Sequence, residues 1–390
     1  MIRDPQFDDI RPYYDEEIPA AMQRIADNDV FPLLASYIFP DKSVEQTRSL
    51  LKSIKTCDEF QVKVMWHVND QIRQRSITNF TYSGIENLEK DKPYLFISNH
   101  RDIMLDASVL QNVLYDNGMA TTEITFGANL MTSSLVIDIG KANKMFRVER
   151  PGIMNLREFY IKSKHLSDYI RFTITEKKQS AWIAHRNGRT KDGNDITDQG
   201  VIKMLGMSKR EDKIAALEEL NIVPLAISYE WETCDYMKAL ELYQSRFEKY
   251  VKKQGEDLAS ILSGITKPKG DVHLSICKPV SREDLSKFDS LTNIEYEREV
   301  AKLIDRRIHE AYALTPNNFI AHDIRFGKHE FKGLEYDDEH EARFINRING
   351  LLKYEVEEPE VLKDIFLGIY SNPVDNCFKY SSTADASPIA

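Results

Sequence analysis

A histidine at position 100 lies between two patterns, and two carboxylates follow it closely. Residues 94–97 form a short apolar run typical of a buried strand. Apolar side chains then recur at helical spacing over residues 103–114, and Asn117-Gly118 is a stop signal for that helix. His100 is therefore predicted at the carboxyl end of a strand, where open α/β sheets bind their ligands. A histidine held there by a carboxylate can act as a general base.

Two aspartates compete for the role of that carboxylate. Asp106 or Asp102 could orient the imidazole of His100, since both follow it closely. Asp102 could instead cap the helix that follows and take no part in chemistry. The local pattern therefore leaves the choice between the two acids open.

Two clusters of basic residues follow His100, although the chain as a whole is acidic. Arginine forks match phosphate geometry, and glycine lets backbone amides approach an anion closely. One cluster alone would be a solvated face, but two clusters that each follow an apolar run favour a phosphate site. Residues 192–195 look like part of a calcium loop without its later ligands and are interpreted as a turn. The clusters comprise Lys141, Lys144, Arg147 and Arg150 in one segment, and Arg186, Arg189 and Lys191 around Gly188 in the other.

Four segments in order over residues 80–230 resemble the motifs of the glycerolipid acyltransferases, the superfamily that acylates glycerol-3-phosphate and 1-acylglycerol-3-phosphate. The sequence is most similar to a divergent bacterial branch. The segments are Asn99-His100 with the aspartate behind it, Lys144 to Arg150, Asn187-Gly188-Arg189, and the apolar run Ile222 to Ile227 around Pro224.

Two departures from these motifs bear on the site. Five residues separate His100 from Asp106, where the family has four, and Leu105 stands in the usual place of the acid. Asn187 replaces the glutamate of the third motif. The resemblance implies catalysis by His100 with Asp106 or Asp102. It also implies substrate binding by a set comprising Arg147, Arg150, Asn187, Gly188, Arg189 and Pro224.

The predicted reaction is the transfer of an acyl group to a hydroxyl of glycerol-3-phosphate or its 1-acyl form, in phospholipid synthesis. The donor is acyl-CoA, acyl carrier protein or acyl phosphate, and acyl carrier protein is thus a candidate partner. No cofactor and no metal are expected. Two alternatives stay open, an N-acyltransferase that makes an amino-acid lipid and a catalytically silent protein that binds acyl chains or phospholipid. A serine hydrolase is disfavoured because no Gly-x-Ser-x-Gly elbow is present.

Composition bears on the partners and the cellular location of the predicted enzyme. The 390 residues carry a formal net charge of −10, which argues against nucleic acid as a partner. No signal peptide is recognisable, and no apolar stretch reaches the roughly 20 residues that span a bilayer. The four cysteines lack paired spacing and are expected to be reduced thiols. We therefore expect a cytoplasmic protein with peripheral membrane contact, since the acyl product belongs to the bilayer.

The chain divides into three predicted parts. Residues 1–75 are a helical N-terminal region, residues 76–315 an α/β acyltransferase domain, and residues 316–390 a helical extension whose last 20 residues form a frayed tail. Alternation of strand and helix patterns predicts an α/β fold, a mixed and largely parallel sheet flanked by helices, with an N-terminal helical bundle. The predicted strands are 94–97, 123–126, 181–184, 223–228 and 272–277, and the main predicted helices are 102–116, 154–175, 236–263, 295–312, 337–352 and 357–370.

Overall fold

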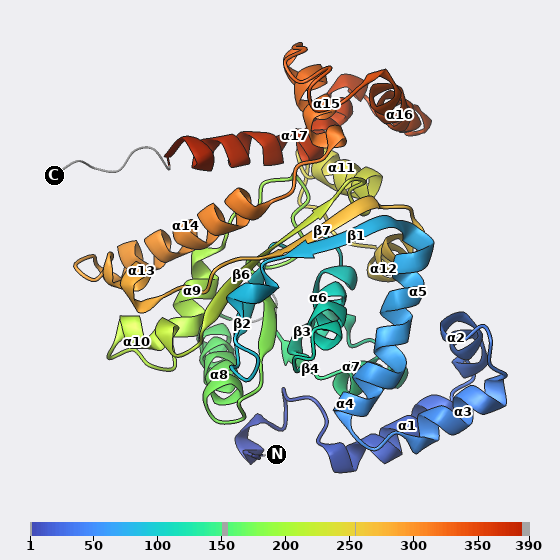
Figure 1. Ribbon diagram of the computed structural model, residues 1–390, viewed down its shortest axis with the longest axis vertical. Helices are drawn as coiled ribbons and strands as arrows, with labels where there is room; N and C mark the ends of the chain where they lie inside the picture. Colours follow the sequence, from blue (N-terminus) through green and yellow to red (C-terminus); the bar gives the residue numbers. More distant parts are fainter. Residues whose placement is uncertain (1, 150–154, 254, 384–390) are drawn as a thin grey trace.

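The computed structural model describes residues 2–149, 155–253 and 255–383, and a seven-stranded sheet lies at its centre (Figure 1). The strand order is β1-β7-β6-β2-β5-β3-β4. Only the β6–β7 pair is antiparallel among the pairs in this sheet. This confirms the predicted α/β fold with a mixed, largely parallel sheet. The strands are β1 Ile77–Ser83, β2 Leu95–Ser98, β3 Glu123–Gly127, β4 Met145–Val148, β5 Ala181–Ala184, β6 Ile222–Tyr229 and β7 Gly270–Ile276.

Five of these strands coincide with the predicted ones, and two were missed for physical reasons. Strand β1 lies at one edge of the sheet and is mostly exposed, so its sequence lacks an apolar run. Strand β4 lies at the other edge and includes Arg147, whose charge conceals the strand pattern. Edge strands need fewer apolar residues because one side of their ladder faces no neighbour.

Helices cover both faces of the sheet. On one face, α5 (Trp66–Ser76) and α6 (Leu105–Asp116) bury apolar side chains against Phe96, Trp182 and Val223. The opposite face packs Leu95 and Ile97 in a cluster to which several helices contribute. They include α8 Leu156–Thr175, α9 Gln199–Gly206, α10 Lys213–Glu218 and α14 Asn293–Ala311 (Figure 1). Because both faces are covered, the central strands are apolar throughout, as parallel strands usually are.

The N-terminal helices form a core of their own, to which one helix of the α/β domain also contributes. Their buried side chains, among them Ile18, Met22 and Phe60, pack against Ala142 of α7 (Ser134–Ala142). The predicted N-terminal helical bundle is thus present. Its members are α1 Ile18–Ala26, α2 Phe31–Ile38, α3 Val44–Ser53, α4 Cys57–Phe60 and a π-helical turn Gln61–Met65 that leads into α5.

The C-terminal part differs from the prediction in several places, and one of them is α15, which was not among the predicted helices. The single helix predicted at 236–263 is two helices, because an irregular segment interrupts it after residue 244. The helix predicted at 357–370 continues to Thr383, so residues 371–383 are not a frayed tail; residues 384–390 lie outside the described residues. Residues 371–383 are largely polar, and this composition concealed a buried face that includes Ser371 and Val374. The helices are α11 Asp235–Gln244, α12 Glu256–Thr266, α13 Arg282–Ser286, α15 Pro316–Phe326, α16 Asp338–Asn349 and α17 Pro359–Thr383.

Helix α17 lies directly on the loop that follows β5. The side-chain amide of Asn372 donates to the carbonyl of Asp192 at 2.6 Å. Gly193, with φ of 79°, is so close that an added Cβ would stand 2.3 Å from the carbonyl oxygen of Ile369. Only glycine fits there, because the left-handed backbone and the close approach both exclude a side chain.

This contact predicts a large loss of stability for Gly193→Ala. A left-handed residue with a Cβ costs about 1–2 kcal/mol, and a forced overlap adds about 1–3 kcal/mol. Gly333→Ala is the matched control, because Gly333 has φ of 82° with no atom within 4 Å of an added Cβ. Urea unfolding should show a larger loss for Gly193→Ala than for Gly333→Ala. Equal losses would mean that α17 yields without cost.

Candidate active site

His100 and Asp106 form a hydrogen-bonded pair at the carboxyl edge of the sheet. Strand β2 ends at Ser98, and His100 follows two residues later. Its Nδ1 lies 2.8 Å from Oδ2 of Asp106, on the first turn of α6. An ionised carboxylate only accepts hydrogen bonds, so Nδ1 carries the proton and Nε2 keeps a free lone pair. The side chain of His100 is 16% exposed while that of Asp106 is fully buried, so the pair has one open end.

The turn before α6 absorbs the extra residue between His100 and Asp106. The backbone N–H groups of Arg101 and Asp102 donate to Oδ2 of Asp106, at 2.6 and 2.9 Å. The chain therefore closes around the carboxylate before the helix starts at Leu105. This turn lets a five-residue spacing bring the acid to the imidazole.

Asp102 makes the helix-capping contacts that the sequence analysis gave as its alternative role. Its Oδ1 accepts from the backbone N–H groups of Met104 and Leu105, both at 2.9 Å. These are orphan donors at the start of α6, and an aspartate there is a common cap. The geometry therefore favours Asp106 over Asp102 as the partner of His100.

Tyr229, at the end of β6, completes the shell of Asp106. Its hydroxyl donates to Oδ1 of Asp106 at 2.8 Å. Burial, together with the neighbouring charge of Asp106, raises the pKa of Tyr229 well above its ordinary value. The phenol thus stays protonated and remains a donor. Asp106 accepts four hydrogen bonds in all, from His100, Tyr229 and two backbone amides.

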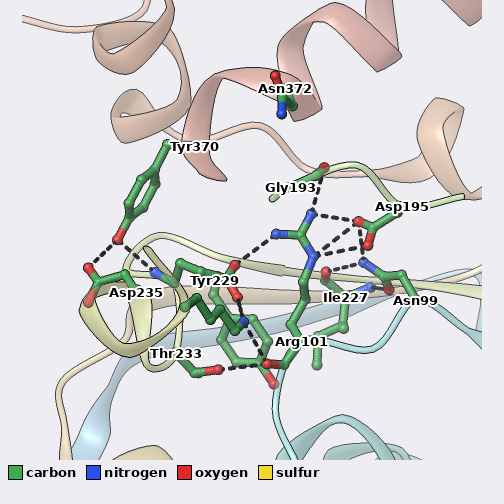
Figure 2. Close-up of polar contacts among 12 residues, drawn as sticks. Asn99, Arg101, Gly193, Asp195, Ile227, Tyr229, Thr233, Asp235, Tyr370 and Asn372 are labelled. Atoms are coloured by element: carbon green, nitrogen blue, oxygen red, sulfur yellow. Dashed lines mark hydrogen bonds and ion pairs between the residues drawn. The ribbon is translucent and has the colours of Figure 1, made fainter. Parts of the chain in front are cut away.

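Arg101, the residue after the histidine, is buried in an ionic cluster (Figure 2). Its guanidinium reaches Asp195 at 2.5 Å, Glu232 at 2.9 Å and the carbonyl of Gly193 at 3.3 Å. Burial would raise the pKa of Asp195, but the charge of Arg101 outweighs it and lowers that pKa below the ordinary value. A buried charge without a partner would cost several kcal/mol, so these groups must assemble together.

The backbone around His100 is fixed from both sides. The amide of Asn99 pairs with the backbone of Ile227, accepting at 2.8 Å and donating at 3.0 Å. The carbonyl of Arg101 accepts from Thr233 at 2.9 Å and from buried Lys238 at 2.8 Å. His100 therefore lies between two anchored residues, and Figure 2 shows those neighbours, Asn99 and Arg101, with their partners.

Sequence reasoning missed this supporting shell. Residues 192–195 were interpreted as a turn, and Gly193 does make one, but Asp195 is also the buried counterion of Arg101. The missed group comprises Arg101, Asp195, Tyr229, Glu232 and Lys238. The four members other than Arg101 lie 94 to 137 residues from Arg101 or Asp106, which they contact. The charged triplet His-Arg-Asp after an apolar run was the one feature of the sequence that could have indicated this shell.

The predicted anion-binding loop begins next to the histidine. The backbone N–H of Thr190 donates to the carbonyl of His100 at 2.7 Å, so Arg189 is adjacent to the pair. Nη1 of Arg189 is buried and has no hydrogen-bond partner. Gly188 has φ of 77° with open space around it, whereas Asn187 is exposed. Gly188 and Arg189 thus lie next to the residue that bonds the backbone of His100, and Arg189 has a donor without a hydrogen-bond partner.

Two other predicted residues, Arg147 and Pro224, are less central. Arg147 is exposed and pairs with Glu149 at 2.6 Å. Its strand β4 is three positions from β2 in the sheet, which is roughly 14 Å at ordinary strand spacing. Pro224 is buried in β6 opposite Ile97, below the edge where His100 lies. Arg150 lies outside the described residues.

His185 is a second buried histidine near the site. It follows β5 and is fully buried, and burial lowers its pKa to about 3. It is therefore neutral at physiological pH and is a poor candidate for the base. Over the described ranges, no three His, Cys, Asp or Glu side chains are grouped so that they could hold a metal ion.

Comparison with known proteins bears on this geometry. Residues 79–210, which contain His100, Asp106 and Arg189, match the protein-family model described as Acyltransferase. The match confirms the resemblance to the glycerolipid acyltransferase superfamily, and it shows that the chain carries an acyltransferase domain. The donor and acceptor are not defined by it.

Two further comparisons add little. No curated protein matches the chain. Among solved structures, the 1-acyl-sn-glycerophosphate (LPA) acyltransferase PlsC from Thermotoga maritima is 16% identical, with a TM-score of 0.31. The likeness covers 74% of this chain and 94% of that chain. A TM-score this low supports no inference about fold or substrate.

The geometry predicts that Asp106→Asn lowers acyl transfer more than Asp102→Asn. Asparagine at 106 removes the charge that stabilises the imidazolium, and general base catalysis is worth about 10²–10⁴-fold. Asparagine at 102 can still accept from the backbone N–H groups of Met104 and Leu105, so kcat of Asp102→Asn should fall by no more than about tenfold. Steady-state kcat, with circular dichroism as the folding control, checks the order. The reverse order would assign the orienting role to Asp102.

Proposed function

We propose that this acyltransferase moves an acyl group from an activated donor to a hydroxyl of glycerol-3-phosphate or of its 1-acyl form. One observation carries the proposal. Within the segment matched to the family, the partly open His100 is bonded to a buried carboxylate and lies beside an arginine with a free donor. A base next to an anion-binding group suits an acceptor that has both a hydroxyl and a phosphate.

His100 acts as the general base in this proposal. Nε2 takes the proton of the acceptor hydroxyl while Asp106 stabilises the imidazolium that forms. The acceptor oxygen attacks the carbonyl of an acyl thioester or acyl phosphate and forms the new ester bond. The bond to the leaving group breaks, and the imidazolium returns the proton to that group. No covalent enzyme intermediate is needed, which agrees with the burial of all four cysteines.

The acceptor phosphate is assigned to Gly188 and Arg189. The left-handed backbone at Gly188 exposes amides to an anion, and the guanidinium of Arg189 can form a bidentate pair. Binding there places the phosphate next to the segment of His100, because Thr190 bonds that residue's carbonyl. An uncharged or amino-acid acceptor would leave the free donor of Arg189 unused.

Arg189→Lys should therefore raise the KM for the acceptor, and Arg189→Ala should weaken its use about tenfold to a hundredfold. Lysine keeps the charge but loses the fork, and a hydrogen bond to a charged group contributes roughly 1.5–3 kcal/mol. Arg147→Lys is the comparison variant, because the ion pair with Glu149 already occupies that side chain. Purified protein is assayed with each of the three donor classes against glycerol-3-phosphate, its 1-acyl form and amino-acid acceptors.

Two results would contradict these assignments. Near-normal turnover by folded His100→Ala would remove the base from the mechanism. If Arg189→Ala left acceptor use unchanged and an amino-acid acceptor were preferred, the phosphate assignment would be wrong. An N-acyltransferase would then be the better description. Binding of acyl donors without any transfer would favour the silent binding protein.

We also propose peripheral contact with an anionic lipid surface through α12 and the segment before it. No helix among the described residues is long and apolar enough to cross a membrane. Phe247, Val251, Leu258 and Leu262 are each more than half exposed. Residues 244–267 carry five Lys or Arg against three Asp or Glu, which reverses the sign of the whole chain. Apolar side chains with surrounding cations suit an anionic bilayer surface.

The surface lies close to the site. An added Cβ on Gly264 of α12 would stand 2.2 Å from Oδ2 of Asp102, so the helix packs against the turn that carries His100. A lipid product would therefore leave the site next to the bilayer.

Replacing Leu258 and Leu262 together by Gln should lower binding to phosphatidylglycerol vesicles about tenfold or more, since each buried side chain contributes about 1.5–3 kcal/mol. Leu334 and Leu352, exposed at 82% and 80% away from this segment, are replaced by Gln as the control. Vesicle sedimentation measures binding, with phosphatidylcholine vesicles for the charge dependence. Equal binding by the two double variants would place the contact elsewhere.

A further inference from the structure

Tyr229 is buried and is bonded to the carboxylate oxygen that His100 does not use. Its hydroxyl donates to Oδ1 of Asp106, while Nδ1 of His100 and two backbone amides bond Oδ2. Tyr229 is 1% exposed, so it cannot touch a substrate. It ends β6, whose register with β2 is fixed by the pairing of Asn99 with Ile227. The hydroxyl is thus held rigidly against the carboxylate.

We propose that Tyr229 is a positioning residue that sets the basicity of His100 by partly neutralising the charge of Asp106. This inference rests on the proposed role of His100 as the base. A hydrogen bond to a carboxylate withdraws part of its negative charge, and the carboxylate then stabilises the imidazolium less. The bond from Tyr229 therefore keeps more of His100 in its neutral, proton-accepting form near neutral pH.

The sign of the effect follows directly. Removal of the hydroxyl leaves more charge on Asp106, so the imidazolium of His100 becomes more stable and its pKa rises. The acid limb of kcat/KM against pH reports protonation of the base in the free enzyme. Tyr229→Phe should therefore move that limb to higher pH. Well above the limb the base is neutral in both proteins, and the rates should agree within about twofold.

Other titratable groups around His100 do not produce such a limb. Burial lowers the pKa of His185 to about 3 and that of Lys269 to about 8, so neither titrates in the acid range near pH 6. Burial raises the pKa of Asp305 to about 6, but this carboxyl accepts from Thr197 and does not bond the pair. Among the described residues, charges that act on the neighbouring His185 or Tyr229 include Asp195, Arg101, Arg186, Asp102 and Glu232.

The experiment measures kcat/KM from pH 5 to 9 for the full-length protein and three variants. Tyr229→Phe should shift the acid limb upward by roughly half to one pH unit, which lowers the rate at about pH 5.5 three- to tenfold. Tyr169→Phe is the matched control, because it removes a buried hydroxyl from another carboxylate, Glu123. Asp305→Asn shows whether that carboxyl contributes to the limb. Both controls should leave the limb in place.

A substitution of opposite sign makes the test independent of packing losses. Fluorotyrosine at 229 keeps the hydroxyl and nearly the shape, but its more acidic phenol is a stronger donor. It should move the acid limb to lower pH. An unmoved limb in both Tyr229 variants, or a uniform fall at every pH, would overturn the proposal. If His100→Ala lacks activity while these limbs stay in place, the inference about Tyr229 fails and the proposed function stands.

Discussion

The structure of the site depends on the burial of one positive charge. Arg101 is 1% exposed, and moving such a charge out of water is costly unless anions meet it. Asp195 and Glu232 supply those anions from two different segments. Its backbone meanwhile bonds Asp106, Thr233 and Lys238. The residue next to His100 thus joins the segments after β5 and β6 and helix α11 into one rigid shell.

The buried charge gives the site precision more than stability. A hydrophobic residue in place of Arg101 would avoid desolvation, and replacement of a buried ion pair by apolar groups is often neutral or stabilising. An apolar side chain, however, would accept many positions. The guanidinium is instead directed at two carboxylates and a carbonyl, so it leaves one position for the chain that carries His100.

What could be predicted from the sequence was local. Residues 94–116 contain the strand, the turn and the helix of the pair, so His100 and its two candidate aspartates could be found from the local sequence, although the choice between Asp106 and Asp102 stayed open. Asp195, Glu232 and Tyr229 could not, because their roles depend on strand order in the sheet, with β5 and β6 on the two sides of β2. The edge strands β1 and β4, and the part of α17 after residue 370, were not predicted for a related reason. Their buried faces are narrow, and charged or polar residues outnumber the apolar ones that pack.

The His100–Asp106 contact is local in the sequence, whereas the contacts of Arg101 are distant, and this difference sets the order in which the site can form. The His100–Asp106 contact spans six residues, whereas Arg101 meets Asp195 and Glu232 across 94 and 131 residues. During synthesis at roughly 5–20 residues per second, Arg101 would wait on the order of ten seconds for its last counterion. Until then its charge belongs in water, and β2 cannot be sealed into the sheet. The turn that carries His100 and Asp106 therefore reaches its final form only after residue 232 has been made, although its own residues are made early.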